Sequence, residues 1–266
     1  MKKLFIAGFM LFCYGYSFGQ SQPVTPVTMP ATRPPADPHV MTHFMTEIMD
    51  PEIKMVQSGA KDSDAPSDAI VLFNGGDISN EWVDSKGAPS KWIVKDGLLI
   101  CVPKSGIIKT KRKFNDFQLH IEWRTPDPGV GEGQSRGNSG VFLQELYELQ
   151  ILDSYNNRTY RNGQAGALYK QYAPLVNVSK KPGEWQTYDV IFTAPRFASD
   201  GTSFFTPPRV TVIHNGVLIQ NNVSLRGPTL NAGMPEYSVK KYESGSLMLQ
   251  DHGNPVAYRN IWVREL

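Results

Sequence analysis

The stretch RVTVIHNGVLIQ, residues 209–220, holds two runs of strand-forming residues on either side of Asn215 and Gly216. An Asn-Gly pair tolerates the positive φ values of a tight type I′ turn, and such a turn joins antiparallel strands. The stretch WIVKDGLLIC, residues 92–101, repeats this pattern around an Asp-Gly pair. Both stretches therefore predict β-hairpins, and antiparallel pairing is expected to dominate the fold.

Other short β-rich runs follow from residue 69 onward, and helical periodicity is almost absent. The expected strands are Ala69 to Phe73, Phe117 to Arg124, Val141 to Leu143, Tyr147 to Leu152, Trp185 to Thr193, Ser246 to Gln250 and Tyr258 to Glu265. With the two hairpins the chain has about ten strands or more. So many strands without strand–helix alternation predict an all-β fold, a two-sheet antiparallel sandwich of the jelly-roll kind.

Two of the expected strands alternate between apolar and polar residues. In FQLHIEWR, residues 117–124, the odd positions are apolar, and His120, Glu122 and Arg124 are among the polar even positions. In YELQILD, Glu148 and Gln150 alternate with Leu and Ile in the same way. The plain interpretation is a solvated sheet face. Short polar side chains such as Glu, Gln and His favour a binding groove instead. If the two polar faces share one side, Glu122 and Glu148 are expected in one groove, with their carboxylates within about 10 Å.

The N-terminal region predicts export. Residues 1–19 have two lysines, an apolar run and small residues near a plausible cleavage site, as in a secretory signal. Residues 20–68 are expected to form a Pro-rich tether and an extended segment, followed by one domain over residues 69–266. No later stretch approaches ~20 consecutive apolar residues, so a membrane span is not expected. The expected location is periplasmic or extracellular.

Charge and cysteine content narrow the class of protein further. The formal net charge is +2, and both signs are mixed along the chain, so no nucleic-acid partner is expected. Removal of the signal would leave Cys101 as the only cysteine, which rules out an intrachain disulfide. Its position within LLICV predicts a buried thiol.

Several motifs, taken in order, resemble those of one known family. They are DAIVLFNGGDISNEW, FNDFQLHIEWR, RGNSGVFLQ, YELQILDS, EWQTYDVIFTAPRF, VTVIHNGVLIQ and LQDHGNPVAYRNIWVREL. The chain is similar over residues 69–266 to the 3-keto-disaccharide hydrolase family, formerly a domain of unknown function. The resemblance implies a concanavalin-like jelly roll, exported by glycan-degrading bacteria, that acts on 3-keto oligosaccharides or glycosides.

A ketone at C3 of a sugar acidifies the proton on C2, so that the C1 substituent can leave by β-elimination and water can add back. Such a site needs a base near C2, donors or a cation for the enolate oxygen, and an acid for the leaving group. Glu148 or Glu122 is the candidate base. His120 or His252 is the candidate proton carrier. An arginine or a divalent metal ion is the candidate enolate stabiliser.

The candidate substrate-binding residues come from the same strands and from neighbouring loops. They are Arg124, Arg136, Asn138, Gln144, Gln150 and Asp153. Asp153 can equally cap a turn, and Asp251 with His252 can equally shape a loop. Trp82 and Trp92 are open between core residues and sugar platforms. No compact spacing such as His-x-x-x-His occurs, so metal ligands are left unassigned and no cofactor is certain.

Two other functions are compatible with the same fold. A laminarinase-like glycosidase would carry Glu-x-Asp-x-x-Glu on a strand, whereas ELQILD has Gln150 in place of the Asp and Asp153 in place of the second Glu. This difference disfavours retaining chemistry. A non-catalytic carbohydrate-binding module of the lectin type is the third possibility, because fold alone does not decide function.

Overall fold

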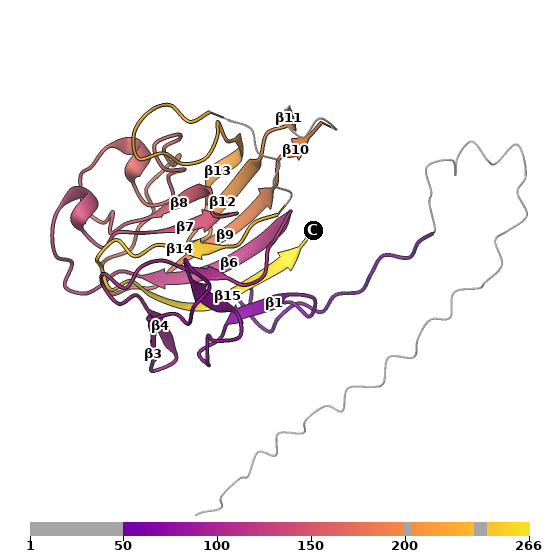
Figure 1. Cartoon of the computed structure of the whole chain (residues 1–266), viewed down its shortest axis with the longest axis horizontal. Helices are drawn as coiled ribbons and strands as arrows, with labels where there is room; N and C mark the ends of the chain where they lie inside the picture. Colours follow the sequence, from indigo (N-terminus) through magenta and orange to yellow (C-terminus); the bar gives the residue numbers. More distant parts are fainter. Residues whose placement is uncertain (1–49, 199–203, 237–243) are drawn as a thin grey trace, which may run out of the picture. The chain divides into compact units, whose positions relative to one another are not determined.

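The computed structural model describes residues 50–198, 204–236 and 244–266. Its backbone divides into two units, Met1–Lys54 and Met55–Leu266, and all described strands belong to the second. Two antiparallel sheets face each other in this second unit (Figure 1). The expected all-β sandwich of the jelly-roll kind is confirmed. The expected signal sequence and the proline-rich part of the tether lie outside the described residues.

The larger sheet has eight strands in the order β13-β12-β9-β6-β15-β4-β3, with β1 paired to β15. These strands are β1 (Ile70–Phe73), β3 (Ile93–Lys95), β4 (Leu98–Ile100), β6 (Phe117–Arg124), β9 (Gln186–Thr193), β12 (Arg209–His214), β13 (Val217–Ser224) and β15 (Ala257–Glu265).

The smaller sheet has five strands in the order β2-β5-β14-β7-β8. These strands are β2 (Trp82–Asp84), β5 (Ile108–Thr110), β7 (Ser139–Leu143), β8 (Tyr147–Ile151) and β14 (Met248–Leu249). A separate two-stranded ribbon and two short 3-10 helices complete the described elements: β10 (Arg196–Phe197), β11 (Phe204–Thr206), η1 (Gly133–Ser135) and η2 (Arg161–Gly163).

The two predicted hairpin turns are confirmed. Asn215 and Gly216, between β12 and β13, have φ values of 50° and 82°, and Asp96 and Gly97, between β3 and β4, have 52° and 73°. Positive φ at both central residues is the signature of a type I′ turn. Four strands were not predicted from the sequence: β2, β5, β10 and β11. Each has only two or three residues, too few to establish an alternating pattern.

The core lies between the two sheets. The odd residues of β6, from Phe117 to Trp123, are all 1% exposed or less. Polar contacts also cross this layer: the Tyr188 hydroxyl of β9 donates to the Gln150 carbonyl of β8 at 2.8 Å. Because every residue of β8 alternates sides, Leu149 and Ile151 point into the core and Glu148 and Gln150 point away from it.

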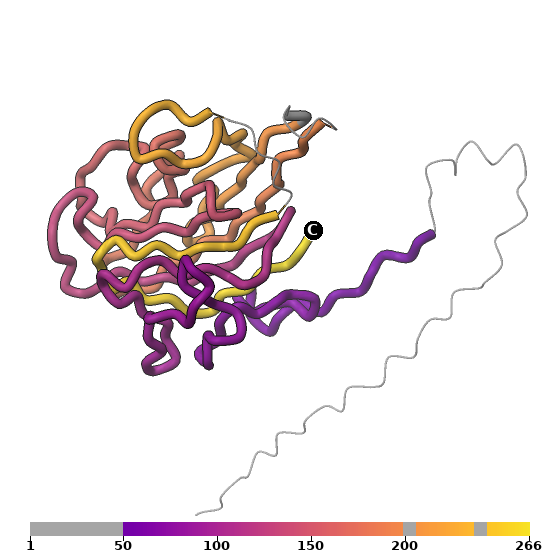
Figure 2. The backbone as a smooth tube through the Cα atoms, viewed as in Figure 1, coloured from indigo at the N-terminus to yellow at the C-terminus, as the bar shows by residue number. Residues whose placement is uncertain are grey.

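The outer face of each sheet is partly covered. On the larger sheet, the Ser63 carbonyl accepts hydrogen bonds from Asn260 and Trp262 of β15 at 2.8 and 3.0 Å. On the smaller sheet, the loops 152–185 and 225–236 run side by side near β7 and β8 (Figure 2), and one hydrogen bond of 2.9 Å joins Gln171 to the Gly227 carbonyl. The smaller sheet therefore has a loop-walled outer face.

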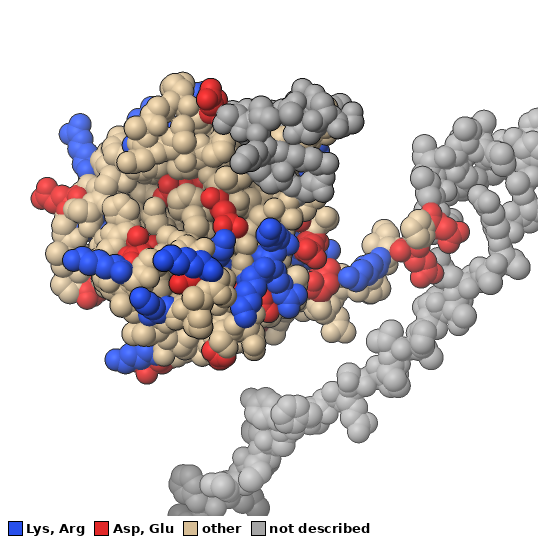
Figure 3. Space-filling model, viewed as in Figure 1, with Lys and Arg blue, Asp and Glu red and all other residues tan. Residues whose placement is uncertain are grey.

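Charges of both signs are interspersed on the molecular face drawn in Figure 3, as expected from the sequence. Within the described ranges, no helix has the length and apolar character needed to cross a membrane.

Candidate active site

A cavity of about 320 Å³ opens on the outer face of the smaller sheet. Its lining residues come from β7, β8 and four loops: Asn138, Phe142, Glu148, Gln150, Tyr169, Thr229, Asn231, Gln250 and His252. Four of these, Asn138, Glu148, Gln150 and His252, are candidates from the sequence. Period-two alternation brings Glu148 and Gln150 to one side, and their partners Phe142 and Gly140 on β7 share that side.

Glu148 is the acid of the cavity, and its pKa is strongly shifted. Its side chain is only 5% exposed, and burial raises the pKa of its carboxyl to about 8, although Lys170 opposes this shift. A carboxyl with a pKa near the working pH is suited to take and return a proton. The position of Glu148 in the strand is fixed through its backbone N–H, which donates to Thr229 Oγ1 at 2.9 Å.

Gly140 makes the space in which the Glu148 carboxylate lies. A Cβ atom at Gly140 would lie 2.7 Å from Glu148 Oε1 and 3.1 Å from its Cγ. Glycine in a strand interior often marks such a close approach. The side chain of Glu148 therefore folds back over the neighbouring strand.

Amide groups surround the carboxyl. Asn138 Nδ2 donates to the Gln134 carbonyl at 2.6 Å, and Gln150 lies within reach of the side chains of both. Rotation of the Gln150 amide by half a turn brings its nitrogen to 3.1 Å from Glu148 Oε1. The cavity thus presents neutral donors and acceptors beside one ionisable acid.

Two loops supply the opposite wall. The Tyr169 N–H donates to the Glu148 carbonyl at 3.0 Å, so that this loop continues the smaller sheet beyond β8. The Tyr169 and Tyr160 hydroxyls are 2.5 Å apart. The Lys170 ammonium contacts the Asn231 carbonyl, which connects the loop 152–185 to the loop 225–236. Neither loop carried a sequence pattern that predicted Tyr169, Thr229 or Asn231.

His252 lies at the exposed rim of the cavity. Asp251 does not orient its ring: the Asp251 carboxylate accepts hydrogen bonds from the backbone N–H groups of Gly106 and Gly253 at 2.9 and 2.8 Å. Asp251 therefore shapes the loop, which was one of its two possible roles. His252 keeps its candidate role as a proton carrier.

The grouping of Glu122 and His120 with Glu148 is wrong. Glu122 and His120 lie on β6, whose odd residues fill the core, so their side chains point to the outer face of the larger sheet. Glu148 points to the outer face of the smaller sheet, on the other side of the sandwich. The expected pair of carboxylates in one groove does not exist, because Glu122 and His120 belong to the larger sheet and Glu148 to the smaller one.

These two residues form an ion network. Burial alone would lower the pKa of His120, but a hydrogen bond to Asp189 at 2.7 Å and an ion pair with Glu122 at 3.7 Å raise it to about 9. Burial would raise the pKa of Glu122, but the ion pair with His120 and hydrogen bonds from Asn260 and Arg259 hold it at about 2. Both groups are therefore charged at neutral pH, and Glu122 is too weak a base for proton abstraction.

We expect Glu122→Gln to leave turnover unchanged and to lower the free energy of unfolding by about 1–3 kcal/mol, the cost of losing a hydrogen-bonded charge. Since the folded pKa of Glu122 lies below its usual 4.5, the stabilisation is present above that pH and disappears as the pH falls to about 2. Urea unfolding and an activity assay at neutral pH test this. Loss of turnover in a stably folded variant would contradict it.

The structure places three of the candidate substrate-binding residues outside this cavity. The Arg124 guanidinium lies 4.7 Å from the Trp185 ring centroid, on the outer side of the larger sheet. Gln144 has a φ of 54° in the turn after β7, and its amide donates to the Phe114 carbonyl. Arg136 donates to Asp153 at 2.7 Å and lines no part of the cavity.

Asp153 caps a turn, which was the alternative to substrate binding. Its carboxylate also accepts a hydrogen bond from the Tyr155 N–H at 3.2 Å, as in an Asx turn, and it is 3% exposed. Together with Arg136 it fixes the loop next to the cavity. Among the residues that the structure describes, no cluster of three or more His, Cys, Asp or Glu could hold a metal ion.

Comparisons with known proteins identify the family of the chain. A family model described as the 3-keto-alpha-glucoside-1,2-lyase-like domain matches residues 68–264. A 3-keto-disaccharide hydrolase of Bacteroides thetaiotaomicron is 25% identical over 246 residues, which cover 75% of this chain and 79% of that protein.

Two solved structures from Parabacteroides distasonis, each described as a candidate glycosyl hydrolase, have related folds. The first is 51% identical, with a TM-score of 0.79, over 84% of this chain and 96% of that one. The second is 23% identical, with a TM-score of 0.54, over 80% of this chain and all of that one, and it shows the fold alone.

Proposed function

This chain belongs to the 3-keto-alpha-glucoside-1,2-lyase-like family, and we propose that it cleaves glycosides whose C3 hydroxyl has been oxidised to a ketone. Cleavage of glycosidic bonds is the activity class that the descriptions of its similar proteins share. The finer points, the 3-keto substrate and an elimination step, rest on the chemistry of the cavity.

The observation that carries the proposal is that the cavity is lined by a single carboxylic acid. Of the described residues that line the cavity, Glu148 alone has a carboxyl group. An ordinary glycosidase uses two carboxylates about 5–10 Å apart, one as acid and one as nucleophile or base. A 3-keto-glycoside needs only one strong base, because the ketone already activates the C2 proton. The cavity therefore supports the keto route over the laminarinase-like one.

In the proposed reaction the Glu148 carboxylate takes the proton from C2, and the electrons of the C2–H bond form the enolate of the C3 ketone. When the ketone re-forms, a C1–C2 double bond develops and the C1–O bond breaks. The aglycone oxygen leaves with a proton, for which His252 is the proposed donor. Addition of water across C1 and C2 would then give net hydrolysis.

The amides of the cavity have a role in this scheme. Asn138 and Gln150 carry N–H donors beside Glu148, and Gln250 supplies a third amide. Neutral donors aimed at an enolate oxygen stabilise developing charge without competing for the base. A divalent ion remains an additional proposal, and no step above depends on it.

The test is to incubate the purified protein with a 3-keto-glucoside and with its unoxidised parent, each with and without a chelator. We expect cleavage of the keto compound only. Cleavage of the parent alone would support a conventional glycosidase, and binding of either sugar without turnover would support a lectin-like module. Loss of keto-glycoside cleavage on chelation would assign a metal to the reaction.

Gly140→Ala is expected to lower kcat/KM by about tenfold or more, because the new methyl group displaces the base, and small misplacements of reacting groups are costly. The melting temperature should stay near that of the wild type. The matched control is the same substitution in a Glu148→Gln background, where it should cost nothing further if Gly140 acts through Glu148. Equal losses in both backgrounds would assign Gly140 another role.

We also propose that the protein works outside the cytoplasm. The support is the pattern of residues 1–19, with its lysines and apolar run. N-terminal sequencing of the mature protein from its native cells tests this. A chain that still begins at Met1 and stays in the cytoplasmic fraction would contradict it.

A further inference from the structure

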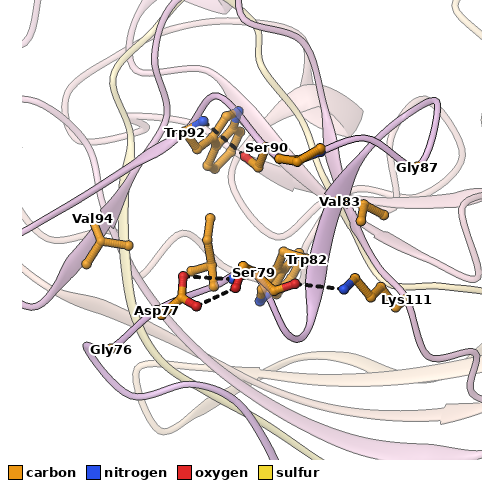
Figure 4. A pocket seen from close by; sticks show the side chains of 12 residues that line it. Gly76, Asp77, Ser79, Trp82, Val83, Gly87, Ser90, Trp92, Val94 and Lys111 are labelled. Carbon is orange, nitrogen blue, oxygen red and sulfur yellow. Dashed lines mark hydrogen bonds between the residues drawn. The ribbon is translucent and has the colours of Figure 1, made fainter.

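A second cavity, of about 430 Å³, lies apart from the Glu148 site and shares no lining residue with it. It opens between β2 and β3, which are the end strands of the smaller and the larger sheet. The loop between β1 and β2, with the sequence NGGDISNE, forms one wall. Figure 4 shows Trp92 on one side of this space and Trp82 with Ser79 on the other.

Two buried tryptophans stand behind the cavity wall: Trp82 is 1% exposed and Trp92 is 4% exposed. Trp82 Nε1 donates to the Leu72 carbonyl and Trp92 Nε1 to the Gly106 carbonyl, each at 2.9 Å. Both indole N–H groups are thus already satisfied. Val94 completes the apolar wall from β3 and is 38% exposed at the cavity. Val94 and Pro89, both exposed, therefore form the accessible apolar wall, and the buried indoles support it from behind.

Polar groups of opposite charge stand on the other side. The Asp77 carboxylate accepts hydrogen bonds from the backbone N–H and the hydroxyl of Ser79. The Lys111 ammonium donates to the Ser79 carbonyl at 2.7 Å, as drawn in Figure 4. A carboxylate has about four acceptor positions and an ammonium three donors, so both groups keep capacity for a ligand.

The wall that carries these groups is preorganised. The N–H groups of Glu81 and Trp82 both donate to the Ile78 carbonyl, and the Lys111 N–H donates to the Glu81 carbonyl. Arg112 adds a salt bridge of 3.0 Å to Glu81. A rigid loop loses little freedom on binding, which favours a site over a mere gap between sheet edges.

We propose that this cavity is a second, non-catalytic carbohydrate site that binds a neutral pyranose residue of a glycan. A pyranose has an apolar C–H face for the wall of Val94 and Pro89 and hydroxyls for Asp77 and Lys111. One acid and one base leave the wall without net charge, so an anionic ligand is not favoured. The volume lies within the usual range of small-molecule sites. This function is independent of the Glu148 chemistry.

The experiment measures binding of cellotetraose and maltotetraose, both neutral, by saturation-transfer NMR and calorimetry. A Glu148→Gln protein serves as the parent, so that turnover cannot interfere. Val94→Trp should fill the mouth of the cavity and weaken binding by about tenfold or more, because the ligand then loses its wall contacts outright. Asp77→Ala, at an exposed loop position, should weaken it by about threefold or more.

Ile93→Trp is the matched control. Ile93 precedes Val94 on the same end strand, is 48% exposed and points to the other side, outside the cavity. It should bind both probes as the parent does. Failure of the parent to bind either tetrasaccharide overturns the proposal. So does equal binding by the parent, Val94→Trp and Asp77→Ala, which would assign the sugar to the Glu148 cavity.

Discussion

Glu148→Gln is expected to lower kcat/KM for a 3-keto-glucoside by about 10²–10⁴, the usual contribution of a general base. The substitution keeps the shape of the side chain and removes only its ionisable group. Substrate binding should change little, since the amides of the cavity are untouched. Steady-state kinetics with a chromogenic 3-keto-glucoside would measure the effect.

The pH profile is the second readout of this experiment. Glu148 acts as a base only when it is ionised, so wild-type kcat/KM should rise with pH up to about pH 8. Glu145→Gln is a matched control, because Glu145 lies three residues away in the turn and pairs with Lys109 on the surface. Wild-type turnover in Glu148→Gln would remove Glu148 from the mechanism.

The same substitution is expected to stabilise the folded protein in alkaline solution. Burial raises the pKa of the Glu148 carboxyl from 4.5 to about 8, so the folded state binds this proton more tightly than the unfolded chain does. As the pH rises from 4.5 to 8, the unfolded chain is ionised first, and stability is lost progressively. Above about pH 8 the folded protein carries the full cost of a buried charge.

Gln has no such cost, so the variant should be more stable than the wild type above about pH 8 by a few kcal/mol. This corresponds to a rise in melting temperature of about 5–15 °C for a domain of this size. Below about pH 4.5 the two proteins should melt together. Calorimetry at both ends of the range measures the difference. A less stable variant in alkaline solution would mean that the fold stabilises the carboxylate.

Much of the fold follows from local patterns. The pair Asn215-Gly216 alone predicts the turn between β12 and β13. The alternation of apolar and polar residues in β6 correctly separates its core positions from its outward ones. Glu148 and Gln150 share one side for the same reason. Such features depend on backbone geometry within a few residues, which a single sequence records directly.

The assignment of faces between strands does not follow from local patterns. Alternation defines two sides of each strand, but a sandwich has two outer faces, and only long-range pairing decides which strand belongs to which sheet. β6 pairs with β9 and β15, whereas β8 pairs with β7. His120 and Glu148 were therefore grouped by residue type although the sandwich separates them.

The missed residues of the cavity have a similar cause. Thr229 and Asn231 lie in a loop far along the chain, and they reach Glu148 only because the Thr229 N–H donates to the Leu146 carbonyl at 2.8 Å. Polar residues in loops are common, so nothing in RGPTLNAG distinguishes a cavity wall from a plain turn.

The close approach of Gly140 and Glu148 also has an evolutionary consequence. Two positions that share one volume cannot drift independently: a larger residue at 140 removes the space for the acid, and loss of the acid frees position 140 to accept a side chain. Descendants of a common ancestor should therefore keep or lose the Gly-Glu pair together. Lineages that have lost both are expected to be the ones that retain the sandwich for binding sugars rather than for cleaving them.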